Sequence, residues 1–318
     1  MPNSDTITAG ASERLISGLS DGFAFAPFLS PAESLLTIPR DSIPEEREMK
    51  TAPSPLPSST TRAEHRHEVE EIIRSLGGKN GKTVAARAIR IDMHIDLHAT
   101  FETLCRAYPD AFTFAFSTPA SGTWIGSTPE LLLSAGALDI RTMALAGTRK
   151  ASESGPWDRK NTEEQMMVTG FIKEILTRFF PENDISTGTP FTKRFGDVEH
   201  ICTDIIVSAT HSGFPLGQLL TTLSPTPAVC GSDRIASLEL IERLEAFPRE
   251  YYAGFCGPGN IDGTSQFYVM LRSAKCSPDG VCIYAGGGIT PLSDADDEWR
   301  ETEIKSEAII NKLINKQE

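Results

Sequence analysis

Short stretches of alternating or continuous apolar residues recur along the chain, separated by turn-forming residues. A strand places successive side chains on opposite faces of a sheet, so such stretches are typical of strands. In residues 82–93, for example, small or apolar residues alternate with arginine. Strands are predicted at residues 22–30, 82–93, 111–118, 123–127, 138–147, 199–209, 251–259, 266–275 and 281–289.

Other stretches carry apolar residues at every third or fourth position, which is the spacing of one face of a helix. The longest of them covers residues 157–180, where Met167, Phe171, Ile175 and Phe179 step by four. Helices are predicted at residues 63–76, 99–108, 157–180, 215–223, 232–247 and 296–315.

The order of these elements predicts the fold class. The predicted strands come in clusters joined by short turns, and the helices stand between the clusters. Regular alternation of strand and helix would instead favour a parallel sheet. The sequence therefore predicts an α+β fold with mostly antiparallel sheets, in one domain over residues 1–318. Residues 39–61, rich in Pro and Ser, are predicted to be an exposed, disordered loop.

Composition and charge exclude several classes of protein. The 318 residues carry a formal net charge of -13, which argues against binding to nucleic acid or to an anionic membrane surface. None of the six cysteines forms a CxxC pair, so a zinc site or a redox motif is not expected. The N-terminus lacks the apolar core of a secretory signal, and the longest apolar runs are too short to span a membrane. We therefore expect a cytoplasmic enzyme or binding protein.

Acidic side chains are predicted on the inward faces of two helices. At 100° per residue, Glu298, Glu301 and Lys305 lie within about 60° of one another, on a face that later becomes apolar. Glu164 lies at the head of the apolar stripe of residues 157–180. Two carboxylates without nearby His or Cys suit Mg²⁺. The alternative is that these acids stabilise helix N-termini or form surface ion pairs.

Further candidates are two glycine-containing turns and two cations. The glycines of residues 284–290 and 145–150 would let backbone N–H groups approach an anion, or would only form tight turns. Arg272 stands among apolar residues on a predicted strand, where it either reaches solvent or pairs with an anion. Lys82 opens a predicted strand and could act as a base if its surroundings lowered its pKa, although most such lysines are solvated.

Each of these signals is weak alone, but their order along the chain is specific. The successive blocks are GKTVAARA, GSTPELLL, ALAGTRK, KNTEEQ, EHICTD, SPTPAVCG, REYYAGFCGP, FYVMLRSAK, YAGGGIT and EWRETEIKSEA. Over about residues 70–315, and more weakly over 20–40, the chain resembles the chorismate-utilising enzymes. That family includes isochorismate, salicylate, anthranilate and aminodeoxychorismate synthases.

The resemblance implies two packed, mostly antiparallel sheets with helices outside and the active site in a deep cleft. It implies Mg²⁺ held by Glu164 and Glu301, with Glu298 nearby. Lys82 would be the base that activates water, and Glu130 the acid that protonates the departing hydroxyl. The substrate chorismate would be bound by Gly147, Thr148, His200, Val229, Tyr252, Arg272, Gly286, Gly287 and Lys305.

Lys82 also bears on which member this chain resembles, because the lysine is typical of members that add water and absent from those that add ammonia. It favours isochorismate synthase, feeding menaquinone or siderophore biosynthesis. Salicylate synthase, an ammonia-using synthase component and an inactive chorismate-binding homologue stay open as alternatives. Ser224 replaces the usual histidine of its block, and the part before Lys82 is shorter than in the family. We expect activity to survive the change at Ser224, and we expect the shortened part to affect stability or solubility more than the chemistry. The protein is expected to be a monomer or weak homodimer.

Overall fold

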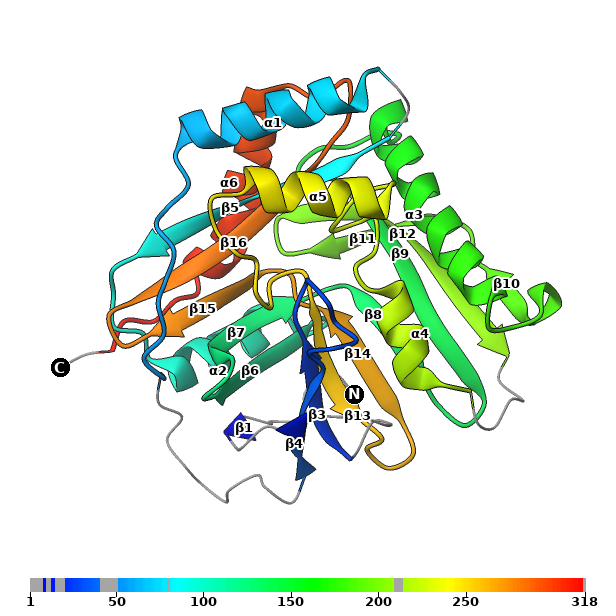
Figure 1. Ribbon diagram of the computed structural model, residues 1–318, viewed down its shortest axis with the longest axis horizontal. Coiled ribbons are helices and arrows are strands. Elements are labelled where there is room, and N and C mark those ends of the chain that lie inside the picture. Colours follow the sequence, from blue (N-terminus) through cyan, green and yellow to red (C-terminus); the bar gives the residue numbers. More distant parts are fainter. Residues whose placement is uncertain are drawn as a thin grey trace.

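The computed structural model describes residues 8–9, 13–14, 21–40, 51–78, 81–208 and 214–316, and its strands form two sheets flanked by helices (Figure 1). The smaller sheet has six strands, in the order β1 (Thr8–Ala9), β6 (Phe112–Thr118), β7 (Gly122–Thr128), β15 (Ser273–Ser277), β16 (Gly280–Ile289) and β5 (Thr83–Ile91).

The larger sheet has ten strands, and β11 (Phe191–Phe195) pairs with its β12 off the main path. Along that path the order is β10 (Ile185–Thr187), β12 (Val198–Ser208), β9 (Asp139–Lys150), β8 (Leu131–Ala135), β14 (Ser265–Val269), β13 (Phe255–Gly259), β3 (Gly22–Ala26), β4 (Leu36–Pro39) and β2 (Glu13–Arg14). Among the described strands β1 and β6 pair in parallel, and the pairings within the larger sheet are antiparallel.

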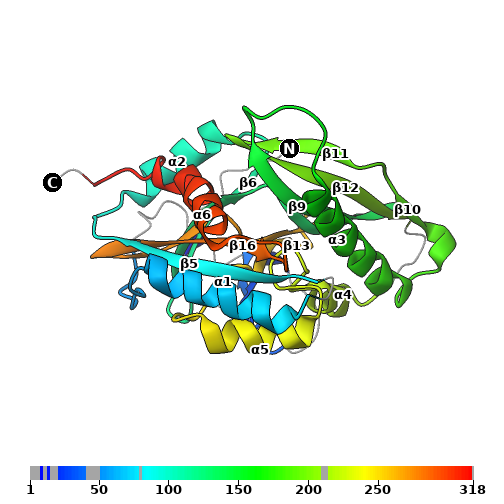
Figure 2. The same ribbon diagram turned by 90° about the horizontal axis from the view of Figure 1, so that it is seen from above.

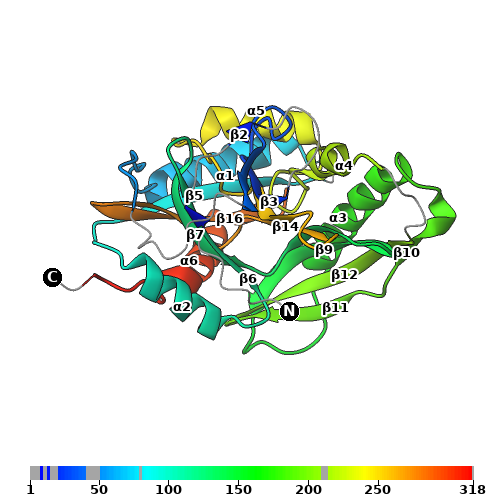
Figure 3. The same ribbon diagram turned by 90° about the horizontal axis from the view of Figure 1, so that it is seen from below.

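Helices cover the outer faces of both sheets. The larger sheet carries α3 (Arg159–Thr177) and α4 (Leu216–Leu223), while α1 (Arg62–Leu76) and α5 (Arg234–Leu244) lie side by side near β5 (Figure 2). α2 (Leu97–Ala107) and α6 (Ala295–Ile310) lie together against the smaller sheet (Figure 3), where the Tyr108 hydroxyl donates to the Ala308 carbonyl. None of the described helices is both long and apolar enough to cross a membrane.

The buried core between the sheets is largely aromatic. Phe25 of β3, in the larger sheet, packs on Phe116 of β6, in the smaller one, with ring centroids 4.5 Å apart. Trp124 of β7 belongs to the same core and is fully buried. The predicted α+β fold of two packed, mostly antiparallel sheets with helices outside is therefore confirmed.

Two element predictions were wrong in instructive ways. The predicted strand 266–275 is two strands, β14 and β15, which belong to different sheets and are separated at Arg272, whose φ is +47°. The buried face of α3 also differs from the predicted stripe, because a four-residue step drifts by about 40° on a helix of 100° per residue. Its buried residues are Gln165, Val168, Ile172, Ile175 and Leu176, whereas Met167, Phe171 and Phe179 are only half-buried.

The predicted loop 39–61 is described only in part. Pro39 ends β4, and residues 41–50 lie outside the described part. Residues 51–60 form neither helix nor strand, as predicted, but they are held to the protein. The Thr60 amide donates to the Ala88 carbonyl at 2.9 Å, and the Ala52 amide donates to the Thr123 hydroxyl at 2.9 Å. This segment covers part of the free edge of β5, so the expectation that it is disordered was wrong for these residues.

Two of the connections between the two sheets are short and lie against each other. Pro129 and Glu130 link β7 to β8, and residues 270–272 link β14 to β15. The Ser127 amide donates to the Arg272 carbonyl at 3.1 Å, and the Val269 amide donates to the Glu130 carbonyl at 3.0 Å. These paired crossings bring Glu130 and Arg272, far apart in sequence, to the same junction between the sheets.

Candidate active site

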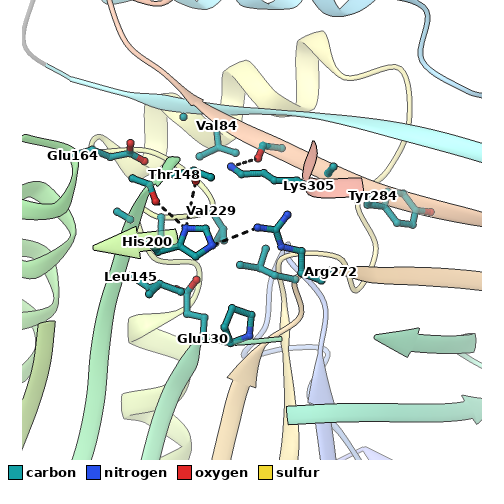
Figure 4. Close-up of a pocket in the computed structure, with 18 of the residues that line it drawn as sticks. Val84, Glu130, Leu145, Thr148, Glu164, His200, Val229, Arg272, Tyr284 and Lys305 are labelled. Carbon is teal, nitrogen blue, oxygen red and sulfur yellow. Dashed lines mark hydrogen bonds between the residues drawn. The ribbon is translucent and has the colours of Figure 1, made fainter. Parts of the chain in front are cut away.

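A pocket opens at this junction (Figure 4). It draws residues from both crossings, from β5, β9, β12 and β16, and from helices α3 and α6. Its lining residues are Val84, Pro129, Glu130, Leu145, Ala146, Gly147, Thr148, Glu164, His200, Ala228, Val229, Tyr252, Leu271, Arg272, Tyr284, Ala285, Gly286, Gly288 and Lys305.

Glu130 is a buried carboxyl on the pocket wall. It is 2% exposed, and burial raises its pKa to about 8, against the lowering influence of Lys82, Lys193 and Lys305. A carboxyl with this pKa is protonated at neutral pH and can donate a proton. The ordinary reason for such a shift, removal of the charged form from water, applies here because the crossing holds Glu130 between the two sheets.

A β-bulge aims His200 into the pocket. The register between β12 and β9 shifts at His200, which faces Gly147 and Thr148 on the other strand. Gly147 has φ +71°, and a Cβ on it would lie 2.9 Å from the Asn161 side-chain oxygen, so the position requires glycine. Asn161, in the first turn of α3, accepts a hydrogen bond from the Thr148 amide and so ties the bulge to the helix.

Arg272 is held in place by His200. The His200 Nδ1 lies 2.8 Å from the Gly147 carbonyl, which can only accept, so Nδ1 carries the proton and Nε2 is free to accept. Nε2 lies 3.4 Å from Arg272 Nη2 (Figure 4). Burial, followed by the charge of Arg272, lowers the pKa of His200 to about 3, so the ring is neutral. The guanidinium is thus oriented by a neutral acceptor and keeps its charge for an anionic ligand.

The glycine run of β16 makes room for side chains. A Cβ on Gly286 would lie 2.8 Å from the Ala85 carbonyl and 3.1 Å from the Tyr252 hydroxyl. The Gly286 carbonyl accepts a hydrogen bond from Lys305 Nζ at 2.9 Å. Gly287 is not among the residues that line the pocket, because it faces α6. The sequence pattern suggested backbone anion binding here, whereas the contacts explain the glycines by close approach.

Three carboxylates beside this strand each pair with a lysine. Lys82 Nζ lies 2.5 Å from Glu164, and Lys305 Nζ lies 2.5 Å from Glu301. Lys160, which the sequence pattern did not single out, lies 2.8 Å from Glu298. Lys82 is fully buried and lies beside Glu164 and Gly288, both of which line the pocket.

The structure therefore brings most of the predicted site residues together. Glu130, Glu164, Gly147, Thr148, His200, Val229, Tyr252, Arg272, Gly286 and Lys305 line one pocket. Lys82, Gly287 and Glu301 lie behind its wall, in contact with residues that line it. Leu145, Leu271, Tyr284 and Val84 were missed, although strand alternation from Gly147 and Lys82 places Leu145 and Val84 on the same faces.

Comparisons with known proteins identify the family. A family model described as "Chorismate binding enzyme" matches residues 32–314. This chain belongs to the chorismate-binding enzyme family. The matched range covers most strands of both sheets, from β4 onward, and every pocket residue named above.

Among similar members of the chorismate-binding enzyme family is "Isochorismate synthase EntC" of Escherichia coli K12, 30% identical over 72% of this chain and 61% of its own length. "Isochorismate synthase MenF" of the same strain is 32% identical over 72% of this chain and 55% of its own length. The match thus spans about half to three fifths of the length of these relatives. A solved structure described as a putative 2,3-dihydroxybenzoate-specific isochorismate synthase, DhbC from Bacillus anthracis, superposes with a TM-score of 0.80 over 92% of this chain and 83% of its own, at 22% identity.

The carboxylates of this family member fit a divalent cation. Within the described residues, no three His, Cys, Asp or Glu side chains converge on one point, because the lysines draw the carboxylates apart. However, Oε2 of Glu298 is buried and makes no hydrogen bond of normal geometry. A Cβ on Gly287 would lie 2.9 Å from that atom and 3.6 Å from Glu301 Oε1, so the glycine leaves space that carboxylates fill.

The charges around these carboxylates also favour a cation. Burial, followed by the neighbouring Glu301, raises the pKa of Glu298. For Glu301 burial acts in the same direction, but Lys305 outweighs it and the pKa is lowered. One of two adjacent carboxyls is therefore costly to ionise without more positive charge, which a metal ion would supply.

Proposed function

We propose that this protein is an isochorismate synthase, which converts chorismate to isochorismate with Mg²⁺. The observation that carries the proposal is the protonated, buried Glu130 facing the same pocket as the fixed cation Arg272, with the buried amine of Lys82 directly behind Glu164. The names of the similar relatives EntC and MenF support this activity over that of the ammonia-using members.

The reaction exchanges one hydroxyl of chorismate for another. Water adds at C2, both ring double bonds shift, from C1=C2 and C5=C6 to C1=C6 and C4=C5, and the C4–O bond breaks. Lys82 takes a proton from the attacking water, and Glu130 gives a proton to the departing C4 hydroxyl, so the charges balance. Glu130 is suited to this role because burial keeps it protonated until the pH reaches about 8. To act as this base Lys82 must be an uncharged amine, so it must give up both its ion pair with Glu164 and its extra proton before it accepts a proton from water.

Binding and orientation fall to the rest of the pocket. Arg272, held by His200, would bind a carboxylate of the substrate, and Tyr252, Val229 and Thr148 would shape the wall around the ring. Glu164, Glu301 and Glu298 would hold Mg²⁺. When bound, this ion would neutralise the ring carboxylate and fix the ring's orientation.

Product analysis tests this function. The full chain is incubated with chorismate and Mg²⁺ in the absence of ammonia, and the products are separated by liquid chromatography. Isochorismate alone is the expected product. Salicylate with pyruvate would assign a salicylate synthase, anthranilate formed only with added ammonia would assign an ammonia-using enzyme, and no turnover in either condition would leave an inactive binding protein.

The metal assignment predicts that Glu301→Gln and Glu298→Gln weaken metal binding by about 10–100-fold or more, since each removes one of the anionic oxygens beside Gly287. Mn²⁺ titration followed by electron paramagnetic resonance measures this without turnover. Glu307→Gln is the matched control, because Glu307 lies on the same helix and is exposed. Unchanged Mn²⁺ binding in both variants would contradict the assignment.

The remaining expectations complete the proposal. Residues 1–318 form one catalytic domain, monomeric or weakly dimeric, that works in the cytoplasm and supplies menaquinone or siderophore biosynthesis. The core shared by the two sheets supports the single domain. Ser224 does not line the pocket, and its carbonyl accepts a hydrogen bond from Arg234, which supports retention of activity despite the missing histidine.

A further inference from the structure

A buried charged cluster lies behind the pocket, on the far side of β5. It consists of Glu68 of α1, Glu245 at the end of α5, and Arg249, with side chains almost entirely excluded from solvent. None of the three lines the active-site pocket. Buried charges are costly unless they are paired and hydrogen-bonded, so their arrangement calls for an explanation beyond the proposed reaction.

The cluster faces the free edge of a strand. β5 is the last strand of the smaller sheet, so one row of its backbone groups has no neighbouring strand. At its start, the Val84 amide donates to the Cys230 carbonyl at 2.7 Å, and Lys82 exchanges hydrogen bonds with Ser232. Further along, Ala88 exchanges hydrogen bonds with Thr60. The groups between these two sets belong to Val84 and Ala86.

The Glu245–Arg249 pair fills this gap. Glu245 accepts from the Ala86 amide at 3.1 Å, and Arg249 Nη2 donates to the Val84 carbonyl at 2.9 Å. The two side chains thus supply one acceptor and one donor in the places where a further strand would supply them. They are joined to each other through Arg249 Nε, 2.8 Å from Glu245 Oε2.

Arg249 also contacts two other residues that line the active-site pocket, Val229 and Tyr252. Its Nη1 donates to the Val229 carbonyl at 2.7 Å, and its own carbonyl accepts from the Tyr252 amide at 2.9 Å. Val84, Val229 and Tyr252 all line the active-site pocket. One guanidinium therefore adds to the direct hydrogen bonds that join the strand beginning beside Lys82 to the segment that carries Val229.

The charges in the cluster are balanced by the pair alone. Burial acts to lower the pKa of Arg249, but the Glu245 carboxylate more than offsets this and the pKa is raised. Burial, followed by the charge of Glu245, raises the pKa of Glu68 well above its ordinary value. Burial therefore favours the uncharged form of the Glu68 carboxyl, whose Oε1 has no hydrogen-bond partner. A glutamine at position 68 would have nearly the same shape and charge.

We infer that the Glu245–Arg249 pair is a positioning unit for the reaction, which replaces a missing strand beside β5 and thereby sets the place of Lys82 and Val229. The inference rests on the proposed function only for the role of Lys82. The placement of the strand itself can be tested without turnover.

Kinetics of two variants test the effect on the reaction. Arg249→Lys cannot span both carbonyls and Glu245 with one compact ammonium, and Glu245→Gln removes the charge that holds the guanidinium. We expect kcat to fall by about 10–100-fold, since misplacement by about 1 Å can cost that much. Glu68→Gln, the matched control, should keep wild-type kinetics.

Hydrogen exchange measured by mass spectrometry gives the second readout. Peptides covering residues 82–90 and 226–234 should exchange faster in both variants, whereas the β11–β12 hairpin should be unchanged. Wild-type kcat with wild-type exchange would overturn the inference. Loss of protection spread over the whole chain, or an unfolded variant, would also overturn it, since both would show a general structural role. If the wild-type protein did not turn over chorismate, the proposed function would be refuted. The exchange pattern alone would then test whether the Glu245–Arg249 pair positions β5.

Discussion

Replacing Glu130 by glutamine should flatten the dependence of stability on pH and reduce turnover by about 10²–10⁴-fold. The folded protein holds this carboxyl at a pKa of about 8, while in the unfolded chain the pKa lies near its ordinary value of 4.5. Between these values the unfolded state ionises and the folded state does not, so stability falls as the pH rises, and the loss is complete above about pH 8. From pH 5 to pH 9 the loss amounts to about 4 kcal/mol.

Denaturant unfolding of the wild type and of Glu130→Gln at pH 5 and pH 9 measures this difference. Between the two pH values the free energy of unfolding of the variant should fall by about 4 kcal/mol less than that of the wild type. Glu174→Gln is the control, because Glu174 is exposed on α3 and its loss should change neither stability nor turnover. Equal pH dependence in the wild type and Glu130→Gln would show that Glu130 is already ionised in the folded protein.

Replacing Lys82 by alanine should reduce isochorismate formation by about 10²–10⁴-fold and at the same time strengthen metal binding. The first effect follows from loss of the base. The second follows from the 2.5 Å contact between Lys82 and Glu164, because the ammonium competes with a cation for that carboxylate. Steady-state kinetics and Mn²⁺ titration measure the two effects separately.

Lys82→Ala should thus lower activity but raise metal affinity, and these opposite effects distinguish loss of the base from loss of stability. A merely destabilised protein would lose both activity and metal binding. Lys173→Ala is the control, since Lys173 is exposed on the same helix as Glu164 and should leave both measurements unchanged. Normal water addition by Lys82→Ala would show that another group is the base.

Local rules accounted for most helices and for the inward-facing acids. Residues 62–76 form a helix as predicted, because Thr61 and Glu64 make a capping box at its start and Gly77 adopts φ +58° at its end. Glu298 is buried and Glu301 is partly covered, as the helical face predicted. In these cases the signal lies within a few residues of the feature.

Features that depend on distant partners could not be predicted in this way. The alternation of residues 266–275 continues without a Gly or Pro at the point where the chain leaves one sheet for the other. Arg272 takes a positive φ there although it is neither Gly nor Asn. Lys82 and Glu164 are 82 positions apart, and only the folded chain brings them into contact. The raised pKa of Glu130 likewise depends on burial between two sheets, which no local pattern reveals.

The two paired crossings have a consequence for how the pocket can move. Glu130 and Arg272 are part of the covalent links between the sheets, and these links are hydrogen-bonded to each other. Any rotation of one sheet against the other would change the separation between the proton donor and the anion-binding cation. Ligand entry by hinge-like opening of the sheets would therefore dismantle the site. Glu130 and Arg272 are instead already in place before the ligand binds, so ordering these two side chains costs little conformational entropy on binding.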